Sequence, residues 1–274
     1  MSISLEASGQ RIVIDPSAGG RAVSWVIDGH EVLAVRSPHP VEHGMYVMAP
    51  WAGRLRDNAI TWAGTTHELP ATYECWALHG TVLDRAADVI DQVDGRLVLT
   101  TDLGPTFPWR GCVRTTWEVD DERLLTSIAL EADDEPFPGV VGWHPWFRRV
   151  IEGHRAEWVM ADARIAEREA DYRLSGELRE VTTPHGTFDD AFFSPACTAR
   201  IAWDGLLAIE VRNSHPWFVV FDALPDFLCL EPQSGPPNGV NDAIVGSVSV
   251  ARPGAPLVMR TEWRIRRDRP ADSA

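Results

Sequence analysis

The segment Ala87–Leu103 reads ADVIDQVDGRLVLTTDL and decides the fold class of this chain. Two runs rich in Val, Leu and Thr flank the dipeptide Asp94-Gly95. An Asp-Gly pair between apolar runs is among the strongest sequence signals for a two-residue β-hairpin turn. The segment therefore predicts two antiparallel strands joined by a tight turn.

Neighbouring segments repeat this organisation in both directions along the chain. On the C-terminal side, Asp120-Asp121-Glu122 separates two more runs of strand character, Val113–Val119 and Arg123–Ala132. On the N-terminal side, Arg11–Asp15 and Arg21–Ile27 alternate apolar and polar residues with a period of two, the period at which strand side chains change face. Similar short runs continue toward the C-terminus, so the sequence predicts a succession of antiparallel strands.

The whole pattern is that of an all-β protein with roughly a dozen or more short strands. We expect a large antiparallel β-sandwich or barrel. Because no linker-like segment divides the chain, we expect a single domain over residues 1–268. The polar tail 269–274 is expected to fray. Ala161–Asp171 is rich in Ala, Glu and Arg, as many helices are, but its apolar periodicity is weak.

Composition excludes several functional classes. The formal net charge of −15 opposes binding to nucleic acids or anionic membranes, which require clusters of Lys and Arg. It suits a protein that handles a neutral or weakly charged small molecule, as a monomer or a homodimer. No apolar run is long enough for a transmembrane helix, and the N-terminal MSISLEASGQ lacks the features of a signal peptide, so a cytoplasmic location is expected.

Cysteine and tryptophan usage adds two further indications. The cysteines are widely separated and form no Cys-x-x-Cys pair, which opposes zinc-ribbon and thioredoxin-like functions and predicts free thiols, most of them buried. The 12 Trp residues are many for 274 residues. Their aromatic faces either fill the core or stack on the C–H surfaces of sugars.

A second stretch, Phe227–Asn241 (FLCLEPQSGPPNGVN), places an acid where a strand ends. Phe227–Leu230 have strand character, Glu231 follows, and Pro232 begins a segment rich in Pro and Gly. Burial at such a position raises a carboxyl pKa unless nearby donors stabilise the anion, and a tunable carboxyl is what a general base requires. Glu231 is thus either a general base or a structural acid that caps the sheet edge or pairs with an Arg.

Three other polar residues share this context: Arg54, His79 and His144 each adjoin Gly or Pro at the edge of an apolar segment. Polar groups at strand ends, far apart in sequence, can converge in a concave site on a β scaffold. Taken singly, each histidine can equally be a hydrogen-bonded structural residue, and the arginine an ion-pair partner. Two histidines and a glutamate can also bind a metal, but the chain lacks the closely spaced ligand pair that metal sites usually contain, so no metal is expected.

Six short motifs follow one another along the chain: GGRAVSWVIDGHEVL (19–33), WAGRLRDNAI (51–60), ALHG (77–80), GWHPWF (142–147), FDDAFF (188–193) and CLEPQSGPPNGVN (229–241). In content and order they resemble the aldose 1-epimerase, or galactose mutarotase, family. The short GWHPWF and LEPQSGPPN forms are similar to its bacterial, hexose-6-phosphate 1-epimerase-like branch. The resemblance implies a large antiparallel β-sandwich, in agreement with the strand pattern.

The resemblance also implies an isomerase that interconverts the α and β anomers of a free hexose without a cofactor or a metal. By position in the motifs, Glu231 resembles the base that removes the proton of the C1 hydroxyl, and His144 the acid that protonates the ring oxygen. His79 resembles a second histidine that hydrogen-bonds near the ring oxygen, and Arg54 a residue that grips sugar hydroxyls. Asp189 resembles an Asp that binds a ring hydroxyl, with the adjacent Asp190 as the alternative.

The chain departs from the family at Gly53, where many relatives carry Asn. One sugar contact is therefore either missing or supplied by Asn58. Trp76, just before the ALHG motif, and Trp146, just after His144, can stack on the sugar or pack in the core.

The identity of the substrate stays open at this point. A 6-phosphate needs a cationic subsite, which Arg54, Arg56 and Arg85 could supply, although the acidic balance of the chain opposes it. The alternatives to a mutarotase of free hexoses are a hexose-6-phosphate 1-epimerase, a non-catalytic sugar-binding or regulatory protein on the same fold, and a metal-dependent cupin-like enzyme. A mutarotase predicts a bell-shaped pH dependence that needs Glu231 ionised and His144 protonated.

Overall fold

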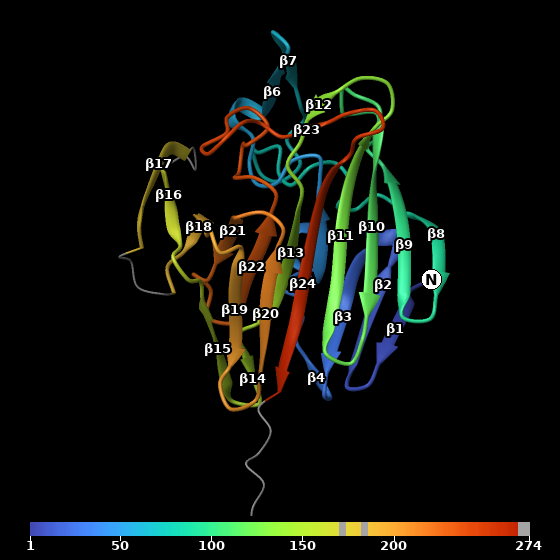
Figure 1. The fold of residues 1–274 in the computed structure, drawn as a ribbon, viewed down its shortest axis with the longest axis vertical. Coiled ribbons are helices and arrows are strands. Elements are labelled where there is room, and N and C mark those ends of the chain that lie inside the picture. The colour runs from blue at the N-terminus through green and yellow to red at the C-terminus, as the bar shows by residue number, and fades with distance from the viewer. Residues whose placement is uncertain (170–173, 182–185, 268–274) are drawn as a thin grey trace, which may run out of the picture.

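Two large antiparallel sheets packed face to face form the body of the protein, with two small two-stranded sheets at one end (Figure 1). The computed structural model describes residues 1–169, 174–181 and 186–267. In these residues the helical turns are three short 3-10 helices, η1 (Pro16–Ala18), η2 (Pro40–Glu42) and η3 (Arg56–Asn58). The predicted all-β, antiparallel sandwich fold is confirmed.

The strands divide between the sheets as follows. The eleven-stranded sheet contains β1 (Ile3–Ala7), β2 (Gln10–Asp15), β3 (Arg21–Ile27), β4 (His30–Glu31), β5 (Met45–Met48), β13 (Gly142–Arg148), β16 (Arg164–Arg168), β17 (Leu174–Glu180), β18 (Asp189–Phe193), β21 (Trp217–Phe221) and β22 (Phe227–Gln233). The nine-stranded sheet contains β8 (Asp88–Val93), β9 (Arg96–Asp102), β10 (Gly111–Val119), β11 (Arg123–Ala132), β14 (Val150–Ile151), β15 (His154–Val159), β19 (Thr198–Trp203), β20 (Leu207–Asn213) and β24 (Leu257–Arg267). The two-stranded sheets are the hairpin of β6 (Ala59–Trp62) with β7 (Thr65–Glu68), and the pair of β12 (Phe137–Pro138) with β23 (Val250–Ala251).

Large aromatic side chains fill the space between the two sheets. The ring of Trp143 in β13 lies 4.6 Å from that of Trp117 in β10, and the ring of Phe147 lies 6.5 Å from that of Trp263 in β24. Each fully buried Trp removes enough apolar surface from water to contribute on the order of 5 kcal/mol. Because side chains alternate along a strand, His144, between these two core residues, points to the face of its sheet that is turned away from the core.

Most of the short-range predictions are confirmed. Asp94-Gly95 joins β8 to β9, and residues 120–122 join β10 to β11. The helix-like composition of Ala161–Asp171 is misleading, because Arg164–Arg168 form strand β16, which pairs with β17 and β18. Tertiary pairing and burial override local helix propensity there. Residues 170 and 171 of that segment, and the tail 269–274, lie outside the described residues.

The pairing of β13 with β22, in the middle of the eleven-stranded sheet, places His144 opposite Glu231. The two strands pair on both sides of these residues in one register, and the ladder is interrupted at them. Pro145 and Pro232 lie at the interruption, and proline has no backbone N–H to donate. β22 nevertheless continues through Pro232 to Gln233, so the strand ends later than the sequence pattern predicted.

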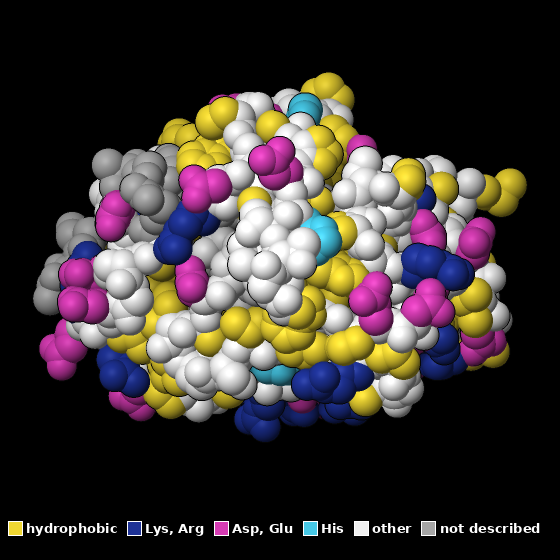
Figure 2. All heavy atoms as spheres, turned by 90° about the horizontal axis from the view of Figure 1, so that it is seen from above, with side chains coloured by type: hydrophobic (Ala, Val, Ile, Leu, Met, Phe, Trp, Pro, Cys, Tyr) yellow, Lys and Arg dark blue, Asp and Glu magenta, His cyan; other side chains and the backbone are white. Residues whose placement is uncertain are grey.

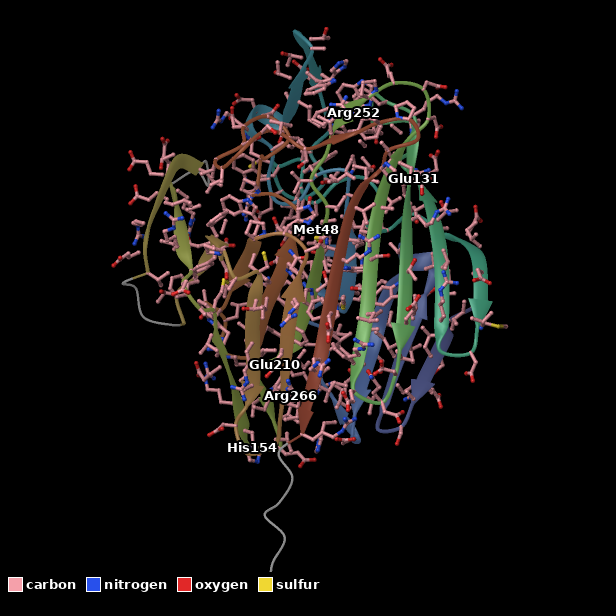
Figure 3. The ribbon with its side chains drawn as sticks, in the orientation of Figure 1. Met48, Glu131, His154, Glu210, Arg252 and Arg266 are labelled. Atoms are coloured by element: carbon pink, nitrogen blue, oxygen red, sulfur yellow. The ribbon has the colours of Figure 1, made fainter. Side chains whose placement is uncertain are left out.

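The solvent-facing side of the nine-stranded sheet is charged. Glu210 in β20 and Arg266 in β24 form an ion pair there at 2.8 Å (Figure 3). Seen from the end that carries the two-stranded sheets, acidic and basic side chains are interspersed (Figure 2). Exposed ion pairs such as Glu210–Arg266 contribute little to stability, because water screens their charges. In the described part of the chain, no helix has the length and apolar character needed to cross a membrane.

Candidate active site

A cavity of about 340 Å³ lies over the middle of the eleven-stranded sheet, on its face turned away from the core. The sheet supplies His144, Asp189 and Glu231 to its wall, and the long connection between β5 and β8 supplies Arg54 and His79. The structure thus brings together five of the six candidate site residues, which are up to 177 positions apart in the sequence.

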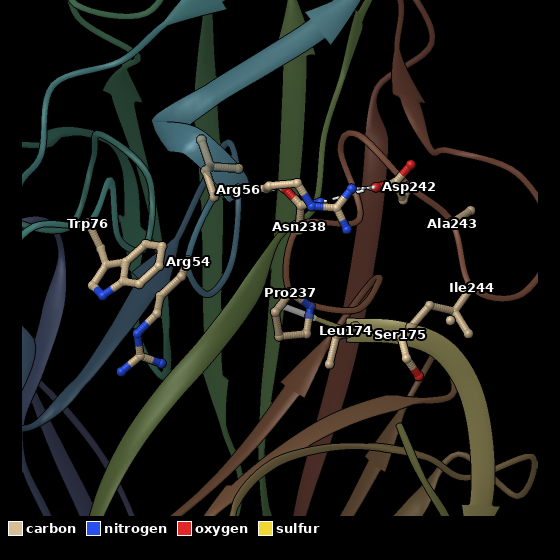
Figure 4. A pocket seen from close by; sticks show the side chains of 12 residues that line it. Arg54, Arg56, Trp76, Leu174, Ser175, Pro237, Asn238, Asp242, Ala243 and Ile244 are labelled. Carbon is tan, nitrogen blue, oxygen red and sulfur yellow. Dashed lines mark hydrogen bonds and ion pairs between the residues drawn. The ribbon is translucent and has the colours of Figure 1, made fainter. Parts of the chain in front are cut away.

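Trp76, the sixth candidate, lines a neighbouring cavity of about 290 Å³ instead. The two cavities share Arg54, Leu174 and Pro237. Figure 4 shows Trp76 beside Arg54 in this second cavity. The indole therefore lies next to the cavity that holds the histidines and Glu231 rather than within its lining.

An acid–base pair forms the centre of the main cavity. His144 Nε2 lies 3.2 Å from Glu231 Oε1, and the two side chains are 7% and 3% exposed. The second carboxyl oxygen of Glu231 accepts a hydrogen bond of 3.3 Å from Gln233 Nε2. Gln233 is two residues further along the same strand, so it shares a face with Glu231. That spacing is the signal by which Gln233 could have been found from the sequence.

Two aromatic rings hold the plane of His144. Its imidazole is stacked between Tyr46, with ring centroids 4.7 Å apart, and Trp146, with centroids 5.5 Å apart. The Tyr46 hydroxyl and the Trp146 indole N–H both donate to the backbone oxygen of Val41, at 3.1 Å and 2.9 Å. The guanidinium carbon of Arg21 lies 4.7 Å from the centroid of the Tyr46 ring. The imidazole is therefore fixed by packing, and Trp146 serves that packing as well as lining the cavity.

Burial sets the protonation of the pair. Loss of solvation raises the pKa of Glu231 well above its ordinary value, and the nearby negative charge of Asp189 adds to this rise. Loss of solvation, together with the smaller effect of the positive charge of Arg21, lowers the pKa of His144 to about 3. Both shifts favour the uncharged forms, so burial favours a pair that holds one proton between its two members and carries no net charge.

His79 is positioned by its own backbone. The residue has a φ of +59°, an unusual value for a side chain with a Cβ, and its Nδ1 accepts a hydrogen bond of 3.2 Å from the Gly53 N–H. The ring is 5.0 Å from that of His144, and burial lowers its pKa well below the ordinary value. A neutral imidazole whose Nδ1 accepts must carry its proton on Nε2, so His79 is a hydrogen-bond donor.

Gly80 explains why the ALHG motif ends in glycine. Its φ is +84°, and a Cβ at this position would lie 1.8 Å from the backbone oxygen of Ala49. Only glycine allows this close approach of two backbone segments. The approach holds the His79 segment against the chain that follows β5.

The two aspartates of the FDDAFF motif take different partners. Asp189 Oδ2 lies 3.9 Å from Arg54, and burial raises the pKa of Asp189. Asp190 pairs with Arg168 at 2.6 Å. Asp189 is paired in register with Phe221, a cavity residue on the same face as Glu231, whereas Asp190 is one position out of phase.

Two residues considered for sugar contacts lie outside the cavity. The side chain of Asn58 does not line the cavity, because its amide donates to the Cys75 oxygen at 2.9 Å and accepts from the Ala77 N–H at 2.7 Å. It therefore fixes the connecting loop and cannot replace the Asn that relatives carry at Gly53. Arg85 also lies outside both cavities, where it pairs with Asp102 at 3.3 Å.

Solved structures of other proteins share this architecture. The fold is similar to a candidate aldose 1-epimerase from Escherichia coli K12 (TM-score 0.85, 18% identity, 97% of this chain and 99% of that one). It is also similar to a galactose mutarotase-like protein from Clostridium acetobutylicum (0.84, 17%, 97% and 95%) and to galactose 1-epimerase from Lactobacillus acidophilus NCFM (0.79, 17%, 98% and 95%). No curated protein sequence matches the chain.

Identities of 17–18% show a common fold alone. The match of the sequence to a family model is the stronger evidence of relationship. The family model described as aldose 1-epimerase matches residues 1–251, which include every residue of the acid–base pair and of the cavity around it. The chain therefore belongs to the aldose 1-epimerase family.

Proposed function

We propose that this protein is a mutarotase that interconverts the α and β anomers of a free hexose by general acid–base ring opening and reclosure. The observation that carries the proposal is the His144–Glu231 pair, with 3.2 Å between Nε2 and Oε1, buried at the centre of a cavity of about 340 Å³. A buried imidazole and carboxyl in contact are costly in a structure unless they are used or fully hydrogen-bonded, and within the described residues His144 Nδ1 has no hydrogen-bond partner.

The chemistry needs two coordinated proton transfers. To open a pyranose, a base removes the proton of the C1 hydroxyl while an acid delivers a proton to the ring oxygen, and the C1–O5 bond breaks to give the open aldehyde. Rotation about the C1–C2 bond and the reverse transfers close the ring on the other face. We assign Glu231 as the base at the C1 hydroxyl and His144 as the acid at the ring oxygen.

The single proton shared by the pair is enough for this cycle. With the proton on His144, Glu231 is ionised and accepts from the C1 hydroxyl, and after opening the proton lies on Glu231. The number of protons on the pair is unchanged, so each turnover restores the starting state. The neighbouring groups then have binding roles: the Nε2–H of His79 donates to the ring oxygen, and Arg54 with Asp189 binds ring hydroxyls.

The charges around the cavity favour a free sugar over a phosphorylated one. Three guanidinium groups among the described residues line the cavity, and each faces a carboxylate: Arg54 with Asp189, Arg168 with Asp190, and Arg36 with Glu42 at 3.2 Å. Glu74 and Glu231 add two more acids to the lining. A phosphate dianion would have to displace a carboxylate from its cation and approach the others, whereas neutral hydroxyls can bind both members of each ion pair.

The test of this function is the rate of anomer interconversion for several sugars. Freshly dissolved α-D-glucose and α-D-galactose are expected to reach equilibrium faster with the protein, and glucose 6-phosphate is expected to show a kcat/KM lower by about tenfold or more, since one unfavourable charge contact costs about 1.4 kcal/mol or more. Polarimetry or NMR exchange measures these rates. A higher kcat/KM for glucose 6-phosphate would identify the protein as a hexose-6-phosphate 1-epimerase. Sugar binding without any acceleration would identify a binding protein.

The dependence of the rate on pH tests the shared proton. The pair gains a second proton only near the lowered His144 pKa of about 3, and it loses its one proton only above the raised pKa of Glu231. kcat/KM is therefore expected to form a broad plateau that begins above about pH 3 and extends to the raised pKa of Glu231. Ordinary pKa values of 4.5 and 6.5 would instead confine activity to a narrow bell between them. A fall in kcat/KM centred near the ordinary histidine value would contradict the one-proton pair.

A further inference from the structure

Cys229 is a buried thiol that the proposed chemistry does not use. It precedes Glu231 by two residues on β22, so both side chains point to the same face of the sheet. The side chain is fully buried, and its pKa is raised by loss of solvation and then by the nearby charge of Glu231. A thiol therefore lies buried beside the acid–base pair.

The thiol completes a set of three metal-ligating groups. One nitrogen of His144, the sulfur of Cys229 and one carboxyl oxygen of Glu231 all lie within 4.8 Å of one another. Zn²⁺ binds nitrogen and oxygen at about 2.0–2.2 Å and thiolate sulfur at about 2.3 Å. Three ligands around one tetrahedral ion are thus roughly 3.5 Å apart, and the His144–Glu231 contact of 3.2 Å already has that separation.

The chemistry of the donors selects the kind of cation. A thiolate together with an imidazole and a single carboxylate suits borderline or soft ions such as Zn²⁺ and Cd²⁺, whereas Mg²⁺ and Ca²⁺ prefer oxygen ligands alone. An ion can reach the site because His144 and Glu231 line the open cavity. Its fourth coordination position would face that cavity and accept water.

We propose that His144, Cys229 and Glu231 form an inhibitory binding site for a thiophilic divalent cation. On binding, the thiol proton and the proton of the acid–base pair leave to solvent, and no oxidation or reduction takes place. The bound ion occupies both groups that would exchange protons with the sugar, so the protein with metal is inactive. The inhibition rests on the proposed mutarotase function, whereas the binding of the metal does not.

Cd²⁺ is the probe, because its bond to a thiolate gives an ultraviolet charge-transfer band. The wild-type protein is titrated with Cd²⁺ while absorbance, heat of binding and mutarotation of α-D-glucose are followed. We expect one equivalent to produce the band and to abolish mutarotation. In Cys229→Ala the band from this site is lost. The affinity for Cd²⁺ is expected to fall more than roughly 100-fold, because loss of a residue that only hydrogen-bonds to a metal ligand already lowers affinity by up to about 100-fold.

Cys75→Ala is the matched control, since Cys75 is an exposed free thiol outside the cluster. It is expected to keep both the inhibition and the band that accompanies it. Cys229→Ser, which keeps a small polar group in place of the thiol, is the second variant if the alanine variant does not fold. The proposal is overturned if Cys229→Ala binds and is inhibited by Cd²⁺ as the wild type is, or if the inhibition is lost in Cys75→Ala. A protein that binds Cd²⁺ through Cys229 but has no mutarotase activity would leave the site intact and remove the proposed function instead.

Discussion

Glu231→Gln is expected to lower kcat/KM for hexose mutarotation by about 10²–10⁴-fold, the range for loss of one positioned proton transfer. Glutamine has nearly the shape of glutamic acid but cannot take a proton from the C1 hydroxyl. Because burial raises the pKa of Glu231 and so favours its neutral form, a neutral amide is expected to replace it at little cost in stability. Sugar affinity is expected to change only a few-fold.

The stability of this variant separates loss of chemistry from loss of folding. A group whose pKa is raised by folding stabilises the protein below its unfolded pKa, and that contribution is lost as the pH rises through the folded pKa. Glu231→Gln removes this loss, so at alkaline pH the variant is expected to be at least as stable as the wild type. Polarimetry, calorimetric sugar binding and thermal unfolding provide the three readouts. Glu210→Gln, on the outer face of the other sheet, is the matched control and is expected to keep full activity.

If Glu231→Gln retained more than about a tenth of the wild-type rate, the loss would be smaller than one proton transfer supplies and Glu231 would not be the base. A wild-type protein that binds sugar without accelerating its mutarotation would instead support a sugar-binding role. The two results are distinct, because the first compares the variant with an active wild type and the second needs no variant.

Local sequence patterns predicted the hairpins and the motif residues, because both depend on neighbours in the chain. The Asp94-Gly95 turn needs two positive or near-helical backbone conformations that these residues adopt readily, and it forms as expected. The strand at Arg164–Arg168 was not predicted, because its Ala and Glu content favours a helix. This segment is a strand because it pairs with β18, and local sequence patterns do not predict which strands will be neighbours in the sheet.

The protonation states of Glu231 and His144 could not be predicted from the sequence for a similar reason. Glu231 and His144 could be named from their motifs, but their 3.2 Å contact follows from the order of β13 and β22 in the sheet. An ionised glutamate beside a protonated histidine was therefore assumed, whereas burial favours the neutral pair. Tyr46 carries no motif at all and still fixes the plane of His144, because β5 lies next to β13.

His144→Gln is expected to lower kcat/KM by about 10²–10⁴-fold as well, and its combination with Glu231→Gln distinguishes a pair from two independent groups. Two independent groups would multiply their losses to about 10⁴–10⁸-fold in the double variant. Groups that share one proton act as a unit, so removing the second has little further effect. We expect the double variant to be no slower than the slower single variant, to within a few-fold, as measured by polarimetry at high protein concentration.

Acid unfolding gives this variant a second readout that does not depend on catalysis. Folding lowers the pKa of His144 from 6.5 to about 3, so its contribution to stability is present above pH 6.5 and is lost as the pH falls toward 3. His144→Gln removes this pH-dependent term, so the free energy of unfolding is expected to fall less steeply between pH 6.5 and 3 than in the wild type. Part of the fall remains, because the pKa of His79 is also lowered by folding. At neutral pH the variant loses the stacking on Tyr46 and Trp146, about 0.5–1.5 kcal/mol per ring pair. Two results together would show that His144 and Glu231 titrate and act separately. They are multiplied rate losses in the double variant and, in His144→Gln, a fall in stability between pH 6.5 and 3 that is the same as in the wild type.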